Sequence, residues 1–285
     1  MELEKIFALS QQDQLKALQL YVQKLVSALP TGGHKSTRKG SGIEFKEYKN
    51  YVPGDNIRQL DWKYYARTDH YMIKEAEVEK LEEFVFVLDR SASMRFASAE
   101  LSKLNYAKVL IAALSFLAEN QHDQYSIFGN SFEKYTYQQF LQQLIQINTN
   151  SQFNHEELYP TAIAPFKSTI FILTDAYFDA EILEETLRKW SIAANKVVLI
   201  HMLFKIERDL AYQQEQFRFQ DLETGKTIEV NAPDQRKDYQ LKMANWISNT
   251  QALCRQYQII YHPFDAQQTV LHHIFRLTEK LRAPF

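Results

Sequence analysis

A short apolar run that ends in an acidic residue and two spaced hydroxyls constrains the fold of this chain more than any other stretch. The run is Phe84-Val85-Phe86-Val87-Leu88, and Asp89, Ser91 and Ser93 follow it. Five apolar residues, four of them β-branched or aromatic, are too few for a helix and predict a buried strand. The loop after this strand then carries three oxygen donors, one at every second position. Oxygen donors of this kind suit Mg²⁺ or Mn²⁺ better than zinc or copper.

The chain after this loop alternates between helical and extended patterns. Helices are expected at 98–120, 138–147, 180–194, 235–256 and 266–281, and strands at 124–128, 169–174, 196–204 and 257–261. Such alternation predicts an α/β fold with a doubly wound, mostly parallel sheet. Residues 207–230 break the rhythm, and a turn at Glu223-Thr224-Gly225-Lys226 predicts an inserted hairpin there.

Two further segments precede the main sheet. Residues 1–33 are expected to form an N-terminal helix, because apolar residues recur at three-and-four spacing before Pro30 and the Gly32-Gly33 pair. Residues 34–82 lack a helical period and contain the turn signal Pro53-Gly54-Asp55-Asn56, so a small β-rich segment is expected. Residues 83–285 then form the α/β domain, which includes the hairpin.

Composition excludes several classes of protein. The 285 residues carry a formal net charge of −2, which gives no general attraction to nucleic acid or to anionic membranes. The longest apolar stretch, 106–118, is interrupted by Lys108 and stays below the ~18 residues of a membrane span. A single cysteine, Cys254, cannot form an internal disulfide. Together with an N-terminus that does not resemble a secretion signal, this favours a cytoplasmic protein.

A second expected strand also ends in a carboxylate. Phe171-Ile172-Leu173-Thr174 is followed by Asp175. Ligands of doubly wound sheets bind beyond the carboxyl ends of the strands, where neighbouring strands lie ~4.8 Å apart. Asp89 and Asp175 would repel each other there unless a proton or a cation lies between them. The alternative is structural, because an acidic residue at a strand end often caps a helix or satisfies its own turn.

Enzymatic interpretations have weaker support. Phosphatases of the haloacid dehalogenase type use a strand-end aspartate as nucleophile, but they need a second aspartate where this chain has Ser91. The sequence also lacks a His-Glu-x-x-His zinc motif and a Gly-x-Ser-x-Gly elbow. A glycine-rich stretch near Gly33 does not match the phosphate-binding loop pattern, since His34 stands where that pattern has lysine. We therefore expect a protein that is not an enzyme.

Two sets of residues resemble known families. Asp89-Arg90-Ser91-Ala92-Ser93-Met94 with Asp175 is similar to the metal-ion-dependent adhesion site of von Willebrand factor type A domains. The second set resembles the signature of the domain-of-unknown-function 58 family. It consists of Gly40-Ser41-Gly42-Ile43-Glu44-Phe45, Tyr51-Val52-Pro53-Gly54-Asp55-Asn56-Ile57-Arg58, Leu60-Asp61-Trp62-Lys63 and Ala66-Arg67-Thr68. By motif, the resemblance covers roughly residues 32–205.

This resemblance implies a von Willebrand factor A-like fold with a β-rich segment before its first sheet strand. Members of the family are typically bacterial or archaeal, often accompany MoxR-type AAA+ ATPases and have no established catalytic activity. The resemblance also implies one more hydroxyl ligand from the loop 148–153, where Ser151 fits the spacing and Thr149 is the alternative. Ala176 stands where such sites commonly have glycine.

Four residues of the β-rich segment allow two interpretations. In the structural one, Arg58 and Asp61 bond across a turn and Trp62 fills the seam beneath the segment. In the functional one, Arg58, Asp61, Trp62 and Arg67 form a docking face for the partner ATPase. Surface ion pairs contribute only ~0–1 kcal/mol, so exposure of these residues would favour docking.

These observations lead to an expected function and two alternatives. The expected function is that of an adaptor in protein maturation. It would bind a carboxylate of a partner or client protein through Mg²⁺ or Mn²⁺ held by Asp89, Ser91, Ser93, Ser151 and Asp175. One alternative is a metal-free scaffold that binds its partner through the β-rich face. The other, with less support, is a Mg²⁺-dependent phosphohydrolase.

Overall fold

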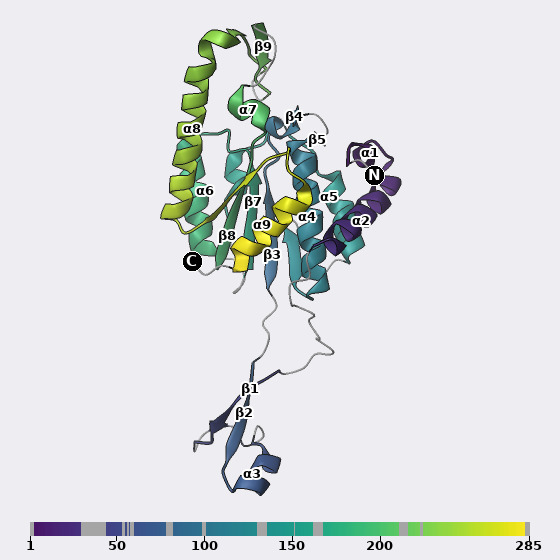
Figure 1. Ribbon diagram of the computed structural model, residues 1–285, viewed down its shortest axis with the longest axis vertical. Coiled ribbons are helices and arrows are strands. Elements are labelled where there is room, and N and C mark those ends of the chain that lie inside the picture. Colours follow the sequence, from purple (N-terminus) through teal and green to yellow (C-terminus); the bar gives the residue numbers. More distant parts are fainter. Residues whose placement is uncertain are drawn as a thin grey trace. The chain divides into compact units, whose positions relative to one another are not determined.

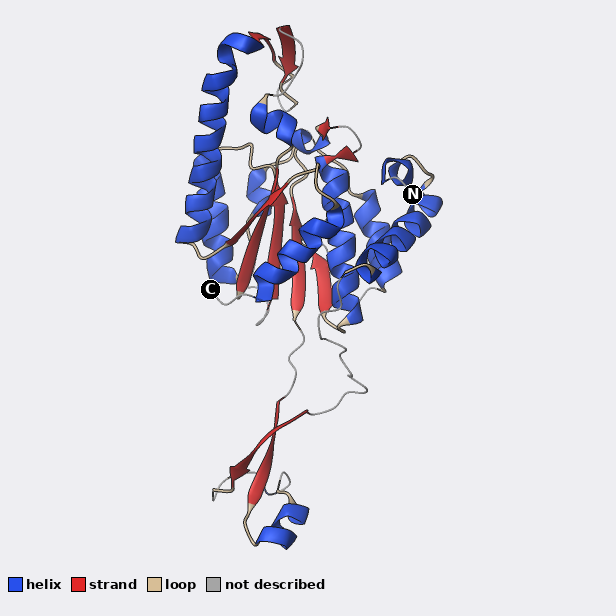
Figure 2. Ribbon diagram, viewed as in Figure 1, coloured by secondary structure: helices blue, strands red, loops and turns tan. Residues whose placement is uncertain are grey.

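The computed structural model divides the chain into two compact units. It describes residues 3–29, 44–52, 55, 57, 60–77, 82–98, 101–129, 136–150, 152–161, 168–210, 216–222 and 225–282. The larger unit combines residues 1–29 with residues 82–285, and the smaller unit spans residues 30–81. Figures 1 and 2 show the elements of both. The helices at the N-terminus, α1 (Leu3–Phe7) and α2 (Gln11–Ser27), thus belong to the unit that contains the main sheet.

The centre of the larger unit is a parallel sheet of five strands. These are β3 (Glu83–Leu88), β6 (Gln124–Ile127), β7 (Ser168–Thr174), β8 (Lys196–Met202) and β11 (Ile260–Phe264), in the order β11-β8-β7-β3-β6. Every residue of β7 is buried, as a central parallel strand requires. The predicted doubly wound α/β sheet is confirmed, and its strand order is consistent with a von Willebrand factor A-like fold.

Alternate residues of the central strands pack into two hydrophobic cores. Phe86 and Phe171 face one core, which also contains residues of α2, α4 (Lys103–Asn120), α5 (Tyr137–Gln146) and α9 (Val270–Arg282). Val85 and Ile170 face the other core, with α6 (Ala180–Ala193) and part of α8 (Ala232–Gln256). Because side chains alternate across a strand, apolar side chains lie on both faces of the sheet. Helices cover both faces and exclude water from them (Figure 2).

Several elements lie at the carboxyl edge of this sheet (Figure 1). A short 3₁₀ turn, η2 (Ala92–Arg95), follows β3 and leads into the small hairpin β4 (Ala97–Ser98) and β5 (Leu101–Ser102). Helix α7 (Lys205–Asp209) follows β8 and leads into the antiparallel pair β9 (Gln216–Gln220) and β10 (Thr227–Asn231). A second 3₁₀ turn, η3 (His155–Leu158), precedes β7.

Several boundaries differ from those expected from the sequence, and three of the differences have a physical reason or consequence. Helix α4 begins at Lys103 rather than Ser98, because the Ser102 hydroxyl accepts the Asn105 N–H at 3.2 Å and caps the helix there. The region expected to be a hairpin begins with α7, so its strands start only at Gln216. The last strand runs from Ile260 to Phe264, three residues beyond the expected start, and its Pro263 is tolerated because β11 is an edge strand.

The described residues of the smaller unit form an antiparallel strand pair and the helix α3. β1 (Glu44–Asn50) pairs with β2 (Met72–Glu77), and between them lies α3 (Trp62–Thr68). The helix was not expected in a β-rich segment. It forms because the Asp61 carboxylate accepts the N–H groups of Lys63 and Tyr64 and caps its first turn. The expected turn at 53–56 lies largely outside the described residues.

No helix in the described ranges combines the length and apolarity that crossing a bilayer requires.

Two buried histidines link β11 to α9. His262 Nε2 lies 3.0 Å from His273 Nδ1, and His273 Nε2 lies 2.9 Å from the Asp265 carbonyl oxygen. We assign both Nε2 atoms as donors, which leaves His262 Nδ1 buried without a partner. A proton on that nitrogen would be poorly solvated. Burial and the neighbouring His273 accordingly lower the pKa of His262 from 6.5 to about 3.

This pair predicts an acid-sensitive fold. A lowered histidine pKa in the folded state means that the unfolded chain binds more protons below about pH 6.5, so stability is complete above that pH and falls towards pH 3. The expected slope is about 1.4 kcal/mol per pH unit for one such histidine. Urea unfolding from about pH 7.5 to about pH 4 measures it. His262→Gln should flatten the slope, whereas the exposed neighbour exchange His272→Gln should not.

Candidate functional site

The structure places Asp89 and Asp175 at the ends of two adjacent strands. β3 pairs with β7 in a register that sets Leu88 against Leu173, and the Asp89 N–H donates to the Leu173 carbonyl at 2.9 Å. The connections after β3 and β6 lead to opposite sides of β3, so this pair of strands is the point where strand order reverses. Ligands of doubly wound sheets bind at such a switch point. Both aspartates are nevertheless fully buried.

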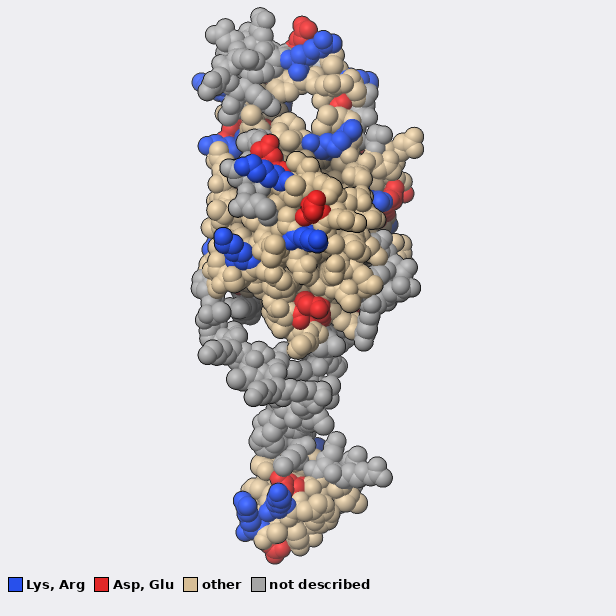
Figure 3. Space-filling view, turned by 90° about the vertical axis from the view of Figure 1, so that its right-hand side faces the viewer, with Lys and Arg blue, Asp and Glu red and all other residues tan. Residues whose placement is uncertain are grey.

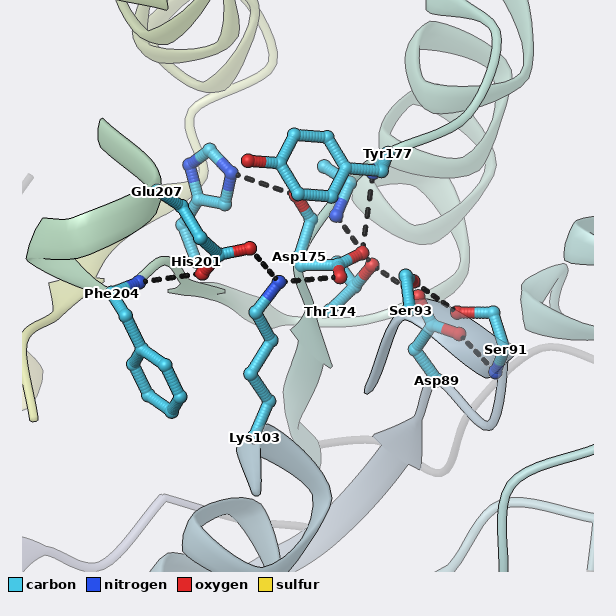
Figure 4. A network of polar contacts seen from close by, with 11 residues as sticks. Asp89, Ser91, Ser93, Lys103, Thr174, Asp175, Tyr177, His201, Phe204 and Glu207 are labelled. Carbon is cyan, nitrogen blue, oxygen red and sulfur yellow. Dashed lines mark hydrogen bonds and ion pairs between the residues drawn. The ribbon is translucent and has the colours of Figure 1, made fainter. Parts of the chain in front are cut away.

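The carboxylate of Asp89 is held on both oxygens (Figure 4). Oδ1 accepts the Ser91 N–H at 2.8 Å, and Oδ2 accepts the Thr174 hydroxyl at 2.6 Å. The Thr174 hydroxyl in turn accepts the Ala176 N–H at 2.9 Å. Burial and the nearby Asp175 raise the pKa of Asp89, while these hydrogen bonds oppose the rise. The loop therefore presents an oriented carboxylate whose charge is only partly compensated by hydrogen bonds.

The hydroxyls of Ser91 and Ser93 form the second part of the site. Their Oγ atoms are 3.0 Å apart, with Ser91 buried and Ser93 partly exposed. Two adjacent ligands of an octahedral Mg²⁺ with bonds of about 2.1 Å would also be about 3.0 Å apart. No three His, Cys, Asp or Glu side chains within the described ranges converge as metal ligands. An ion at this edge would thus depend on the serine hydroxyls together with Asp89.

A buried lysine occupies the side of the site next to Asp175. Lys103 is the first residue of α4, and its ammonium lies 2.8 Å from Asp175 Oδ2 and 2.6 Å from Glu207 Oε1 (Figure 4). Glu207 comes from α7, and its pKa is raised by burial against the opposing effect of Lys103. Sequence reasoning missed both residues. Starting the helix at Ser98 put Lys103 in its second turn, and Glu207 was assigned to a hairpin.

Aromatic and imidazole groups complete this side. His201 Nε2 lies 3.1 Å from the Asp175 carbonyl oxygen and Nδ1 lies 2.9 Å from the Tyr261 hydroxyl. Burial lowers the pKa of His201 to about 4, so this imidazole is neutral near pH 7. The Tyr177 ring stacks on Trp246 of α8 with centroids 5.1 Å apart. No spacing in the sequence indicates these contacts, because they join a strand end, the strand beside it and a distant helix.

The remaining predicted metal ligand falls outside the described residues. Ser151 is not described, and the alternative, Thr149, is partly buried. The loop that carries both does reach the site, because the Asn150 N–H donates to the Arg90 carbonyl at 2.6 Å. The threonine whose hydroxyl contacts Asp89 is instead Thr174. Ala176 adopts a left-handed φ of 55°, the conformation for which glycine is the usual residue.

The predicted docking residues of the smaller unit have different environments. Asp61 caps α3 and also accepts the Tyr48 hydroxyl at 2.9 Å, so it has a structural role. Trp62 is 58% exposed and does not fill a seam as the structural interpretation expected. Its ring packs edge-on against Tyr65 with centroids 6.4 Å apart. Arg67 is exposed, and Arg58 lies outside the described residues.

The contact of Thr174 with Asp89 predicts a measurable loss of stability. Thr174→Val keeps the shape of the side chain but removes the donor to a buried carboxylate, which should lower the free energy of unfolding by about 1–3 kcal/mol. Urea unfolding at neutral pH measures this change.

Thr186→Val provides the matched control. Thr186 is equally buried, but its hydroxyl donates only to the Ile182 carbonyl of its own helix. A smaller loss is expected there. Equal losses in the two variants would contradict a special role for the Thr174 hydroxyl.

Several known proteins and solved structures are similar to parts of this chain. Uncharacterized proteins of Mycobacterium bovis and Mycobacterium tuberculosis are 34% identical over 103 residues. The match spans 36% of this chain and only 32% of each relative. The conserved hypothetical protein BatB from Bacteroides thetaiotaomicron has a crystal structure that superposes with a TM-score of 0.38 at 16% identity. It covers 70% of this chain and 99% of BatB.

A second solved structure gives a similar result. An aerotolerance-related membrane protein from Bacteroides fragilis superposes with a TM-score of 0.37 at 17% identity, over 70% of this chain and 99% of that one. A family model described as "Protein of unknown function DUF58" matches residues 47–246. Because that match spans more than half of the 285 residues, the chain belongs to the DUF58 family.

Proposed function

We propose that this protein is a non-enzymatic interaction module that binds a partner carboxylate through a Mg²⁺ or Mn²⁺ ion at the switch point of its sheet. The observation that carries the proposal is the Asp89 loop, with two serine hydroxyls spaced as adjacent ligands of an octahedral ion. A carboxylate has about four acceptor positions, and the Ser91 N–H and the Thr174 hydroxyl each use one position on a different oxygen of Asp89, so an ion could bind at another position. Ser93, which is partly exposed, marks the side from which a partner would approach.

The charges around the site also favour a cation. The ammonium of Lys103 contacts the buried carboxylate of Asp175 and the partly buried carboxylate of Glu207, and Asp89 lies on the neighbouring strand end. One positive charge thus faces three groups that can be negative. Buried carboxylates without a matching charge are costly, so a divalent ion near Asp89 would lower the energy of the ionised state. A bound ion would supply an open coordination position for a carboxylate of the partner.

The proposed partner is a MoxR-type AAA+ ATPase acting on a client protein in the cytoplasm, where ATP is abundant. Support for this partner comes from the family resemblance rather than from a contact in the structure. The surface supports a protein rather than a nucleic acid as ligand. On the face shown in Figure 3, basic and acidic side chains are interspersed, and the formal net charge of the chain is −2.

The environment of Asp89 supports a non-enzymatic role. A strand-end aspartate that acts as a nucleophile must reach its substrate with a free carboxylate oxygen. Asp89 is instead fully buried, and each of its oxygens accepts a short hydrogen bond. These contacts orient the carboxylate and reduce its nucleophilicity, which does not favour the phosphohydrolase alternative.

A metal-free scaffold is a second candidate because the smaller unit presents an aromatic and basic surface. Trp62, Lys63 and Arg67 are exposed on α3. Tyr65 and Tyr71 stack beside them with centroids 4.4 Å apart, which fixes the helix on the strand pair. Exposed tryptophan and arginine are typical of residues that dominate protein interfaces.

The metal proposal predicts weak but specific ion binding. Titration calorimetry with MgCl₂ or MnCl₂ should give binding heat for the wild type and an affinity at least about tenfold weaker for Ser93→Ala, which loses one ligand. Ser115→Ala is the control, since its buried hydroxyl donates to the Ile111 carbonyl of α4. Indistinguishable heats for all three proteins would rule out the proposed site.

The partner proposal predicts which surface captures the ATPase. In pull-downs with a MoxR-type ATPase from the same cell, the wild type should retain the ATPase in Mg²⁺ and lose it in EDTA. Ser93→Ala should lose it under both conditions, and the double variant Trp62→Ser with Arg67→Ser should retain it. Retention of the ATPase by Ser93→Ala and its loss in the double variant would identify the metal-free scaffold. If neither the wild type nor any variant retains the ATPase, the proposed partner is wrong.

A further inference from the structure

Lys103 occupies a position where a lysine side chain has a high free-energy cost. Its side chain is fully buried, and it is the first residue of α4, where the positive end of the helix dipole disfavours a cation. Burying an ammonium costs several kcal/mol unless its donors are satisfied. The carboxylates of Asp175 and Glu207, at 2.8 and 2.6 Å, satisfy two of the three. These contacts, rather than helix formation, explain why lysine occupies this position.

Aromatic rings fix the ammonium between these acids. The Tyr177 ring centroid lies 4.8 Å from Nζ, and that of Phe96 lies 5.5 Å away. Both are within the range of cation–π attraction. Figure 4 shows the lysine side chain extending from α4 towards Asp175, with Glu207 on its other side. The cation is therefore held by four groups from three different segments of the chain, and it cannot move to Asp89 without losing these contacts.

We propose that Lys103 is a built-in cation that neutralises Asp175 and Glu207 and so limits divalent ion binding to the Asp89–Ser91–Ser93 side of the site. The inference deepens the proposed function and rests on it for the native role of the ion. Lys103 acts as a positioning and specificity-determining residue. With the lysine present, a divalent ion finds one unneutralised carboxylate and neutral hydroxyls, so its affinity is low and a partner carboxylate completes the site. Without the lysine, Asp175 and Glu207 would lose their counter-charge, and their negative charge would strengthen the attraction of the ion to Asp89.

Lys103 also joins the site to the elements above the sheet edge. Glu207 belongs to α7, and the Tyr239 hydroxyl of α8 donates to the Glu207 carbonyl at 2.7 Å. Replacing the lysine would consequently remove both a charge and a link between α4 and α7. An experiment must separate these two effects. The separation is possible because only the loss of charge can be compensated by adding a divalent cation.

The test is Lys103→Met in the full chain, with thermal unfolding and calorimetric titration by MgCl₂. Met keeps much of the length of lysine and removes its charge. We expect a lower melting temperature without Mg²⁺, recovery when Mg²⁺ is added, and an affinity for Mg²⁺ about tenfold or more tighter than in the wild type. NaCl at equal ionic strength should not restore the melting temperature.

Lys108→Met is the matched control. Lys108 is buried on the same helix, but its ammonium donates to the Ile145 carbonyl at 3.1 Å instead of contacting an acid. This variant should lose stability that Mg²⁺ does not restore. A Lys103→Met protein with the Mg²⁺ response of the wild type would overturn the inference, as would equal recovery of both lysine variants.

Glu207→Gln provides a second measurement if Lys103→Met does not fold. Removing this acid leaves part of the lysine charge uncompensated near Asp89, so Mg²⁺ affinity should fall several-fold below that of the wild type. Unchanged affinity would overturn the inference. The outcomes also separate the two proposals. Mg²⁺ binding by Lys103→Met but not by the wild type would support the built-in cation and contradict the native metal site. Equal Mg²⁺ binding by Lys103→Met and the wild type would support the native metal site and contradict the role of Lys103 as a built-in cation.

Discussion

Burial of carboxylates at the carboxyl edge of a parallel sheet is the constraint on which the rest of this structure depends. Pairing of β3 with β7 brings Asp89 and the residues after Leu173 together, and the packing of helices on both faces removes water from them. Acidic groups placed in this way require donors or positive charge. The chain supplies a backbone N–H, the Thr174 hydroxyl and the Lys103 ammonium, each from a different element.

The way in which these charges are satisfied separates the site into two halves. On one side, Lys103 binds Asp175 and Glu207 and holds α7 close to α4. On the other, Asp89 and the two serine hydroxyls have oriented oxygen atoms and a partly exposed edge at Ser93. The first half resembles a structural ion pair and the second a ligand site. Under the proposed function, this division would make ion binding weak, and a partner carboxylate would complete the coordination of the ion.

The smaller unit is stabilised differently, because a two-stranded pair has little hydrophobic core of its own. Its stability comes from local contacts, in which Asp61 caps α3 and tyrosine rings stack across the strands and the helix. This arrangement leaves Trp62 and Arg67 exposed to solvent, although the Trp62 ring also packs edge-on against Tyr65. The two units thus differ in chemistry: the larger unit has buried acidic residues with a partly exposed Ser93, and the smaller unit has exposed aromatic and basic side chains.

The sequence by itself determined the doubly wound sheet and the position of Asp89 and Asp175, because a five-residue apolar run and the alternation of elements are local patterns. Element boundaries were less determined. Helix α4 begins at Lys103, capped by Ser102, rather than at Ser98, and Asp61 caps a helix in a segment whose aromatic residues favour strands. Only the tertiary structure decided that Lys103 neutralises Asp175 and that Thr174 binds Asp89. Those contacts join residues 72 and 85 positions apart, and no local spacing specifies which side chains meet when separate strands and helices converge.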